Sequence, residues 1–276
     1  MTKTEIGRKS WRQRLLLSAD SLIGWFLHFQ LIHHILQRIF LVLAWCWAAW
    51  TFKIRNRLRI IGRENLPHSA QVLYLSNHLT LIDSFLIGFT VIGFWEAVFF
   101  PSHIPWNAPD AKNYLSRPLW RHVFWLLKNI PVERHSSGIG TIKGMLSRFK
   151  SALQSSTLVL FFEGTRSRNG DIGDCVDGVC YTIDDAKPKR IVPILLHGVN
   201  RVMPIQSDRS KDFSWSNIRS GQEVHVVIGP PIDFGDIQQT NGDLPARTKR
   251  QLIGQRVREA VVKLRDRLPA GIAQPC

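Results

Sequence analysis

The sequence predicts an α/β fold, with a mostly parallel or mixed sheet flanked by helices and a pair of N-terminal helices at a membrane interface. From Arg57 onward, segments that read as strands alternate with segments that read as helices, which is typical of α/β layers. The strand-like segments are apolar throughout, and such strands indicate a sheet that is covered on both faces. The first 52 residues instead hold two uncharged apolar stretches and five of the ten tryptophans.

The two apolar stretches run over 21–37 and 39–52 and are separated by Arg38. Neither reaches the roughly 20 apolar residues that a spanning helix needs. Tryptophan prefers the headgroup boundary of a membrane, and preceding basic residues favour anionic lipid. We therefore predict two helices lying in the interface. A span that crosses Arg38 and a pair of core helices in a soluble protein are the alternatives.

Length, charge and cysteine content indicate the domain organisation, the kind of partner and the redox compartment. The 276 residues fit one large domain with an appendage, which we place as an N-terminal anchor over 1–55 and an α/β domain over 56–276. The formal net charge of +15 predicts an anionic partner, either nucleic acid or an anionic membrane. Cys46, Cys175, Cys180 and Cys276 form no zinc spacing and are expected to be free thiols in a reducing compartment.

Each strand of the α/β domain is predicted from an apolar run, and the clearest helix from apolar residues at 3- and 4-residue spacing over 139–154. The predicted strands are 57–62, 71–78, 96–102, 129–134, 157–164, 190–198 and 223–232. The predicted helices are 83–91, 118–128, 139–154 and 244–268. The aspartate-rich segment 171–185 is expected to be a solvated loop rather than a metal site.

Polar side chains follow several of the predicted strands, where ligands of open α/β sheets bind. His78 follows the second strand, and Asp83 opens the next helix five positions later. An imidazole can take a proton from a hydroxyl while a carboxylate fixes its tautomer, so the two residues are a candidate catalytic pair. The alternative is a plain helix-capping aspartate beside a strand-end histidine.

Two further strand ends carry arginine. Glu163, Gly164, Thr165 and Arg166 end the most apolar strand, and Arg134 ends the short strand over 129–134. Arginine suits bidentate contact with phosphate oxygens, so these ends predict an anion site, with a tight turn and solvated arginines as the alternative.

These segments together resemble the glycerophospholipid acyltransferases, which include the lysophosphatidic acid acyltransferases. The family's four blocks match Asn77, His78 and Asp83; the run ending in Arg134; Glu163 to Ser167; and Val192 with Pro193, over roughly residues 57 to 200. The chain departs from the family where Phe162 replaces a common proline before Glu163. Segment 171–185 also lacks the lysine that relatives commonly carry there.

The resemblance implies an enzyme that moves a fatty acyl group from acyl-CoA or an acyl carrier protein to a lysolipid hydroxyl. His78 is then the general base and Asp83 its orienting partner. The implied substrate-binding residues are Asn77, Arg134, Glu163, Gly164, Thr165, Arg166, Ser167 and Pro193. Pro193 is expected at a strand end, like Arg134 and the segment Glu163 to Ser167. No metal or cofactor is expected, because a thioester is already activated. The default acceptor is 1-acylglycerol-3-phosphate, and a lyso-ornithine lipid is an alternative.

The expected partners are a membrane lipid acceptor, an anionic membrane surface and the acyl-CoA or carrier-protein donor, with no nucleic acid, since no nucleic-acid motif accompanies the charge. We expect a peripheral or monotopic protein on the cytoplasmic face of a membrane, such as a bacterial inner membrane. A lipid hydrolase is disfavoured by the absence of a GxSxG elbow. A non-enzymatic lipid-binding protein would not need both His78 and Asp83.

Overall fold

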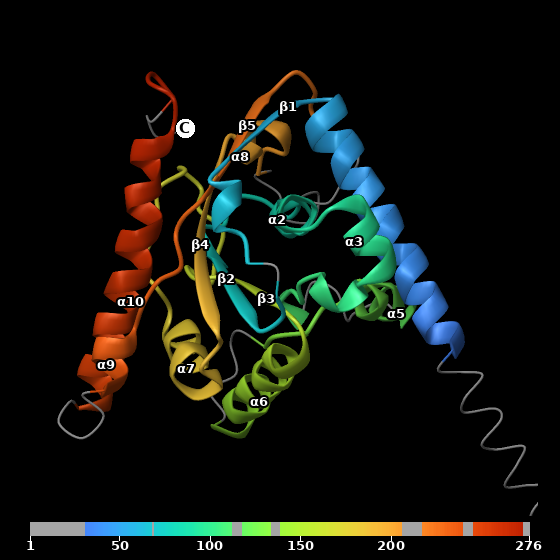
Figure 1. The fold of residues 1–276 in the computed structure, drawn as a ribbon. Coiled ribbons are helices and arrows are strands. Elements are labelled where there is room, and N and C mark those ends of the chain that lie inside the picture. The colour runs from blue at the N-terminus through green and yellow to red at the C-terminus, as the bar shows by residue number, and fades with distance from the viewer. Residues whose placement is uncertain are drawn as a thin grey trace, which may run out of the picture.

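A computed structural model of the chain describes residues 31–67, 69–111, 118–133, 139–205, 217–239 and 245–272. Its centre is a five-stranded sheet in the order β1-β5-β4-β2-β3, flanked by helices (Figure 1). The strands are β1 (Arg57–Ile61), β2 (Val72–Ser76), β3 (Leu158–Phe161), β4 (Arg190–His197) and β5 (Glu223–Ile228). The α/β fold with a mixed sheet is as predicted.

The strand directions bring three carboxyl ends to one edge of the sheet. β2 pairs in parallel with both β3 and β4, so the ends of these three strands lie next to one another. β4 pairs antiparallel with β5, and β1 pairs in parallel with β5 at the far side. Segments that follow β2, β3 and β4 can therefore meet, as expected for an open sheet of this kind.

Each face of the sheet is covered by helices. On one face, α6 (Ile139–Ser155), α7 (Asp177–Ala186) and α10 (Ala246–Lys263) pack over apolar residues such as Leu73, Leu160 and Leu195. On the other, the N-terminal helix (Leu31–Ile54), α2 (Asp83–Val91) and α8 (Val199–Val202) pack over residues such as Val192 and Val226. Burial on both faces explains why the central strands carry no polar alternation.

Three segments differ from their predictions. Residues 96–102 fall in helix α3 (Phe94–Phe99) and a 3-10 turn over Pro101–His103 rather than in a strand, and Glu96 accepts from the Gly93 N–H at the helix start. Residues 129–133 contribute only isolated bridges to Asn107 and Asp110. The segment expected to be a solvated loop contains α7, in which Val179, Cys180 and Ile183 are buried.

The remaining helices lie at the borders of the sheet. α5 (Pro118–Leu126) lies near α3, and α9 (Gly235–Gln239) precedes α10 (Figure 1). The predicted break at Arg38 is absent, because a single helix runs through it over Leu31–Ile54. The first helix predicted over 21–37 therefore continues into the second from residue 31 onward, and residues 21–30 lie outside the described part.

Candidate active site

The turn between β2 and α2 places His78 against Asp83. The Nδ1 atom of His78 lies 2.9 Å from Oδ2 of Asp83. Asp83 is fully buried, whereas the His78 side chain keeps about a tenth of its surface exposed. The five-residue spacing thus folds back into a direct contact, as the sequence predicted.

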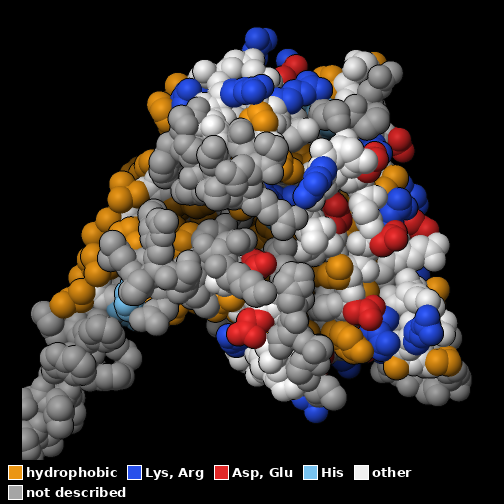
Figure 2. All heavy atoms as spheres, turned by 180° about the vertical axis from the view of Figure 1, so that it is seen from behind, with side chains coloured by type: hydrophobic (Ala, Val, Ile, Leu, Met, Phe, Trp, Pro, Cys, Tyr) orange, Lys and Arg blue, Asp and Glu red, His pale blue; other side chains and the backbone are white. Residues whose placement is uncertain are grey.

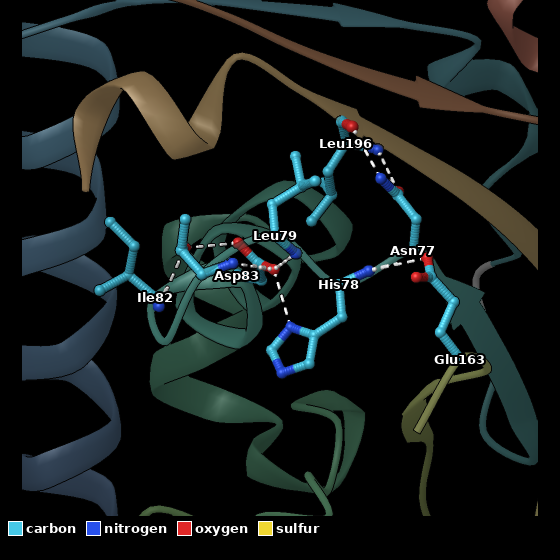
Figure 3. A network of polar contacts seen from close by, with 8 residues as sticks. Asn77, His78, Leu79, Ile82, Asp83, Glu163 and Leu196 are labelled. Carbon is cyan, nitrogen blue, oxygen red and sulfur yellow. Dashed lines mark hydrogen bonds and ion pairs between the residues drawn. The ribbon is translucent and has the colours of Figure 1, made fainter. Parts of the chain in front are cut away.

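Asp83 is held by several other donors (Figure 3). Its Oδ2 accepts the backbone N–H groups of Leu79 at 2.6 Å and Thr80 at 2.8 Å. Its Oδ1 accepts the hydroxyl of Thr80 at 2.6 Å. Hydrogen bonds to a charged group contribute about 1.5–3 kcal/mol each, so this local set fixes the carboxylate rigidly. Asp83 is therefore more than a simple helix cap, because it locks the whole turn that carries His78.

The tautomer of His78 follows from these contacts. An ionised carboxylate can only accept hydrogen bonds, so Nδ1 carries the proton and donates to Asp83. The lone pair then lies on Nε2, which points away from Asp83 (Figure 3). The ring stacks on Phe161 with a centroid distance of 4.0 Å and an interplanar angle of 11°. Carboxylate and aromatic ring together set both the orientation and the tautomer that a general base needs.

Asn77 joins the His78 turn to the neighbouring strand. Its Nδ2 donates to the Leu196 carbonyl at 3.0 Å, and its Oδ1 accepts the Leu196 N–H at 2.8 Å. The buried side chain thus replaces a pair of ladder hydrogen bonds just beyond the end of β2. The geometry gives Asn77 a structural role in placing His78, in addition to the substrate-binding role implied by the resemblance.

Glu163 approaches the same turn from the end of β3. Its Oε1 accepts the His78 N–H at 3.4 Å, and its carboxylate also accepts the Gly173 N–H. Burial raises the pKa of Glu163 to about 7, with a smaller contribution from Asp83, while Arg265 and the two N–H donors act in the opposite direction. Glu163 therefore connects the His78 turn to the loop after β3, which supports a positioning role.

The turn that follows Glu163 requires glycine. Gly164 has a φ of 67°, a left-handed conformation that glycine adopts without strain. A Cβ at this position would also lie 2.9 Å from Cγ1 of Val176. Beyond the turn, the N–H of Ser167 donates to the His78 carbonyl at 2.7 Å. Thr165 is exposed and Arg166 is half-buried, so both lie in a turn that is tied directly to His78.

One predicted site residue, Pro193, is not brought to this position. Pro193 lies inside β4 rather than at its end: it pairs with Leu75, and its carbonyl accepts the Gly229 N–H at 2.9 Å. The fourth block is therefore a buried strand of the sheet, since β4 continues for four residues beyond Pro193, to His197. Arg134 lies outside the described residues.

Sequence reasoning missed three contributors to the site. Thr80 supplies a hydroxyl to Asp83, Phe161 stacks on His78, and Gly173 donates to Glu163. Only Thr80 carried a usable signal, because a hydroxyl residue three positions before a helix-opening aspartate can bond to it. The other two depend on how distant segments pack.

Comparisons with known proteins agree with this architecture. A family model described as Acyltransferase matches residues 57–197. A solved structure, the 1-acyl-sn-glycerophosphate (LPA) acyltransferase PlsC from Thermotoga maritima, is similar in fold with a TM-score of 0.53. It is 16% identical, and the match covers 85% of this chain and 80% of that chain. No curated protein matched.

The family match spans β1 to the end of β4 and thus includes every described residue of the candidate site. The match to the family model confirms the predicted resemblance to acyltransferases, and the shared fold agrees with it. The chain belongs to the Acyltransferase family.

Proposed function

We propose that the chain transfers a fatty acyl group from an acyl thioester to a hydroxyl of a lysophospholipid, with His78 as general base. The observation that carries the proposal is the buried Asp83 carboxylate bonded to Nδ1 of His78 at 2.9 Å. Two backbone N–H groups and a hydroxyl also donate to Asp83, and these hydrogen bonds favour a carboxylate that accepts the Nδ1–H of His78. Such a pair suits proton removal from an alcohol.

His78 and Asp83 are sufficient for the proton transfers of this reaction. Nε2 of His78 takes the proton of the acceptor hydroxyl as the oxygen attacks the thioester carbonyl carbon. Asp83 stabilises the imidazolium that forms. When the tetrahedral intermediate collapses, the C–S bond breaks and the imidazolium returns the proton to the thiolate. The products are an ester and a free thiol, and a positioned base contributes roughly a hundredfold to ten-thousandfold in rate.

The acceptor to test first is 1-acylglycerol-3-phosphate, which would give phosphatidic acid. The structural neighbour described as an LPA acyltransferase supports that choice. The half-buried Arg166, in the turn tied to His78, can hold an anionic headgroup. A lyso-ornithine lipid is the second acceptor, because this chain departs from the family pattern after Ser167. The donor is acyl-CoA or an acyl carrier protein.

Replacing the base tests the proposal. We expect His78→Ala to lose acyl transfer from labelled donor to lysolipid by at least about a thousandfold, because the general base is gone. The assay uses a panel of lysolipids with both acyl-CoA and acyl carrier protein. His103→Ala is the matched control, since it removes another histidine–carboxylate pair, to Glu96 at 2.6 Å, outside the site.

The two variants separate the outcomes. His103→Ala is expected to keep near wild-type activity, and both variants are expected to keep the wild-type unfolding temperature. Near wild-type transfer by folded His78→Ala contradicts the base assignment. A wild-type protein that binds lysolipid without transferring acyl groups would instead indicate a lipid-binding protein.

We also propose that the enzyme attaches to a membrane through one apolar face. Within the described residues, the Leu31–Ile54 helix is long and apolar enough to cross a bilayer. Helix α3 lies beside it (Figure 1), and Trp95 and Phe99 of α3 and Phe100 directly after it are each more than half exposed. Figure 2 shows hydrophobic side chains gathered along this side of the molecule, with Lys and Arg side chains gathered at one end.

The aromatic part of this face can be tested separately from the helix. We expect Trp95→Ser combined with Phe99→Ser to release at least half of the protein from vesicles of anionic phospholipid in a flotation assay, because aromatic rings bury well at the interface. Tyr181→Ser, which removes an exposed aromatic side chain of α7 on the other side of the sheet, is the comparison variant. Unchanged flotation of the double variant would restrict membrane contact to the N-terminal helix.

A further inference from the structure

The C-terminal helix packs directly on the loop that follows the active-site turn, although it lies outside the family match. Ile253 and Val257 of α10 share a core cluster with Ile172 of the loop. A Cβ on Gly254 would lie 3.4 Å from Cβ of Cys175, so helix and loop approach closely at this point. The family model ends at residue 197, so nothing in it assigns a role to this helix.

Two arginines of this helical segment donate to the loop backbone. Arg258 donates from Nη2 to the Ile172 carbonyl at 3.4 Å. Arg265, in the 3-10 extension η6 (Leu264–Arg267), donates from Nη2 to the Gly170 carbonyl at 3.5 Å. Gly254, Arg258 and Arg265 are spaced by four and seven residues, which is close to one and two helical turns. One face of the helical segment therefore contacts the loop.

The loop in turn contacts the active site. Its Gly173 N–H donates to the Glu163 carboxylate, which also accepts the His78 N–H at 3.4 Å. In addition, the Val176 N–H donates to the Phe162 carbonyl at 2.8 Å, so the loop is closed on the end of β3. A continuous series of contacts therefore runs from the C-terminal helix through the loop to the backbone of His78.

We propose that Arg265, assisted by Arg258, is a positioning residue for the acyl transfer: it holds the loop over 170–174 so that the Glu163 carboxylate stays against the backbone of His78. Arg265 itself does not contact the reacting atoms. This role rests on the proposed function, and it extends the active-site machinery from the family-matched segment to the C-terminal end of the chain.

The charge of Arg265 gives this role a measurable signature. Burial and Asp83 raise the pKa of Glu163, and Arg265 lowers it, with a net value of about 7. Removing Arg265 therefore raises this pKa further and protonates more of Glu163 at neutral pH. A protonated carboxyl is a poorer acceptor for the His78 and Gly173 N–H groups, so the acid limb of the pH–rate profile moves to higher pH.

The test compares Arg265→Met with Arg267→Met, which removes the same charge from an exposed side chain in the same turn. Arg265→Met removes the charged donor that holds the loop, so we expect it to lower kcat at least about tenfold. We expect Arg267→Met to stay within about twofold of wild type, because a surface substitution changes little. Arg265→Lys keeps the positive charge, and we expect it to keep the fold and the wild-type position of the acid limb.

A double-variant cycle isolates the coupling to Glu163. In a Glu163→Gln background, Arg265→Met is expected to cause no further loss and no further shift of the acid limb. Equal activities of the two arginine variants, an unmoved acid limb, or independent losses in the cycle would overturn the proposal. Absence of acyl transfer in the wild-type protein would overturn the proposed function instead, which keeps the two failures apart.

Discussion

Asp83 and Lys128 are both ionisable and both nearly excluded from solvent, yet their surroundings differ. Asp83 receives its hydrogen bonds from residues 78–80, within a single short turn. The ammonium of Lys128 donates to oxygens from separate segments: the carbonyls of Pro101 at 3.0 Å and Ile104, and the Ser156 hydroxyl at 2.8 Å. One network is local, and the other joins segments that are far apart in the sequence.

The identity of the partners distinguishes a catalytic charge from a structural one. Asp83 contacts a side chain that can gain and lose a proton and that remains partly exposed. The partners of Lys128 are backbone carbonyls and a hydroxyl, which do not titrate near neutral pH. Burial of a charge is therefore not sufficient to indicate a catalytic group. We expect loss of Asp83 to reduce activity and loss of Lys128 to reduce stability.

The largest expected effect is on activity, in Asp83→Asn. The amide cannot accept all of the hydrogen bonds that the carboxylate accepts, and it no longer holds the Nδ1–H tautomer. Loss of the equivalent carboxylate in a catalytic triad costs on the order of ten-thousandfold in kcat. We expect a fall of at least about a thousandfold in kcat for acyl transfer, measured per folded molecule.

Circular dichroism and the unfolding temperature serve as the controls for Asp83→Asn. A folded variant with activity within tenfold of wild type would contradict the catalytic role of Asp83, because Asp83 would then be a structural residue like Lys128.

The next expected effect is on stability, in Lys128→Met. The substitution leaves buried carbonyl oxygens without their donor, which costs about 1–3 kcal/mol for each unsatisfied group. We expect a lower free energy of unfolding by chemical denaturation, with the specific activity of the folded fraction kept within about threefold of wild type, because Lys128 does not contact the site. A variant that is stable but inactive would contradict this assignment.

The stability difference should also depend on pH. Burial lowers the pKa of Lys128 to about 7, below its ordinary value of 10.5. Between these pH values the unfolded chain binds more protons at this residue than the folded chain, so the stability contributed by Lys128 rises with pH. The stability of wild type relative to Lys128→Met should therefore increase from pH 7 toward pH 10. A constant difference would indicate that Lys128 does not titrate in the folded protein.

Much of the fold could be predicted from the sequence, because apolar runs and helical periodicity mark elements that are buried on a regular face. The helix over Asp83–Val91 and the central strands are found where they were predicted. Helix α3 was mistaken for a strand because its apolar residues lie on consecutive positions, some of which remain exposed. Helix α7 was not predicted because the aspartates of this segment are typical of a solvated loop, whereas Val179 and Ile183 are buried in the structure.

The candidate site shows a similar division. Three candidate residues were identified from the sequence by their positions. His78 and Glu163 each follow a predicted strand, and Asp83 opens the predicted helix after His78. Arg265 could not be identified in this way, since its connection to Glu163 depends on how the C-terminal helix packs against a loop 95 residues earlier in the chain. Pro193 was placed at the wrong position, because the end of β4 lies beyond the hydrophobic motif.

The position of β1 has a consequence for the order of assembly during synthesis. The strand directly follows the Leu31–Ile54 helix, and its ladder forms with β5, where Arg57 pairs with Glu223. The ribosome therefore releases the apolar helix and β1 well before β5, the partner of β1, has been synthesised. β2, β3 and β4 are also complete before β5. The catalytic strands can pair first, and β5 then joins them to the strand that leads from the apolar helix.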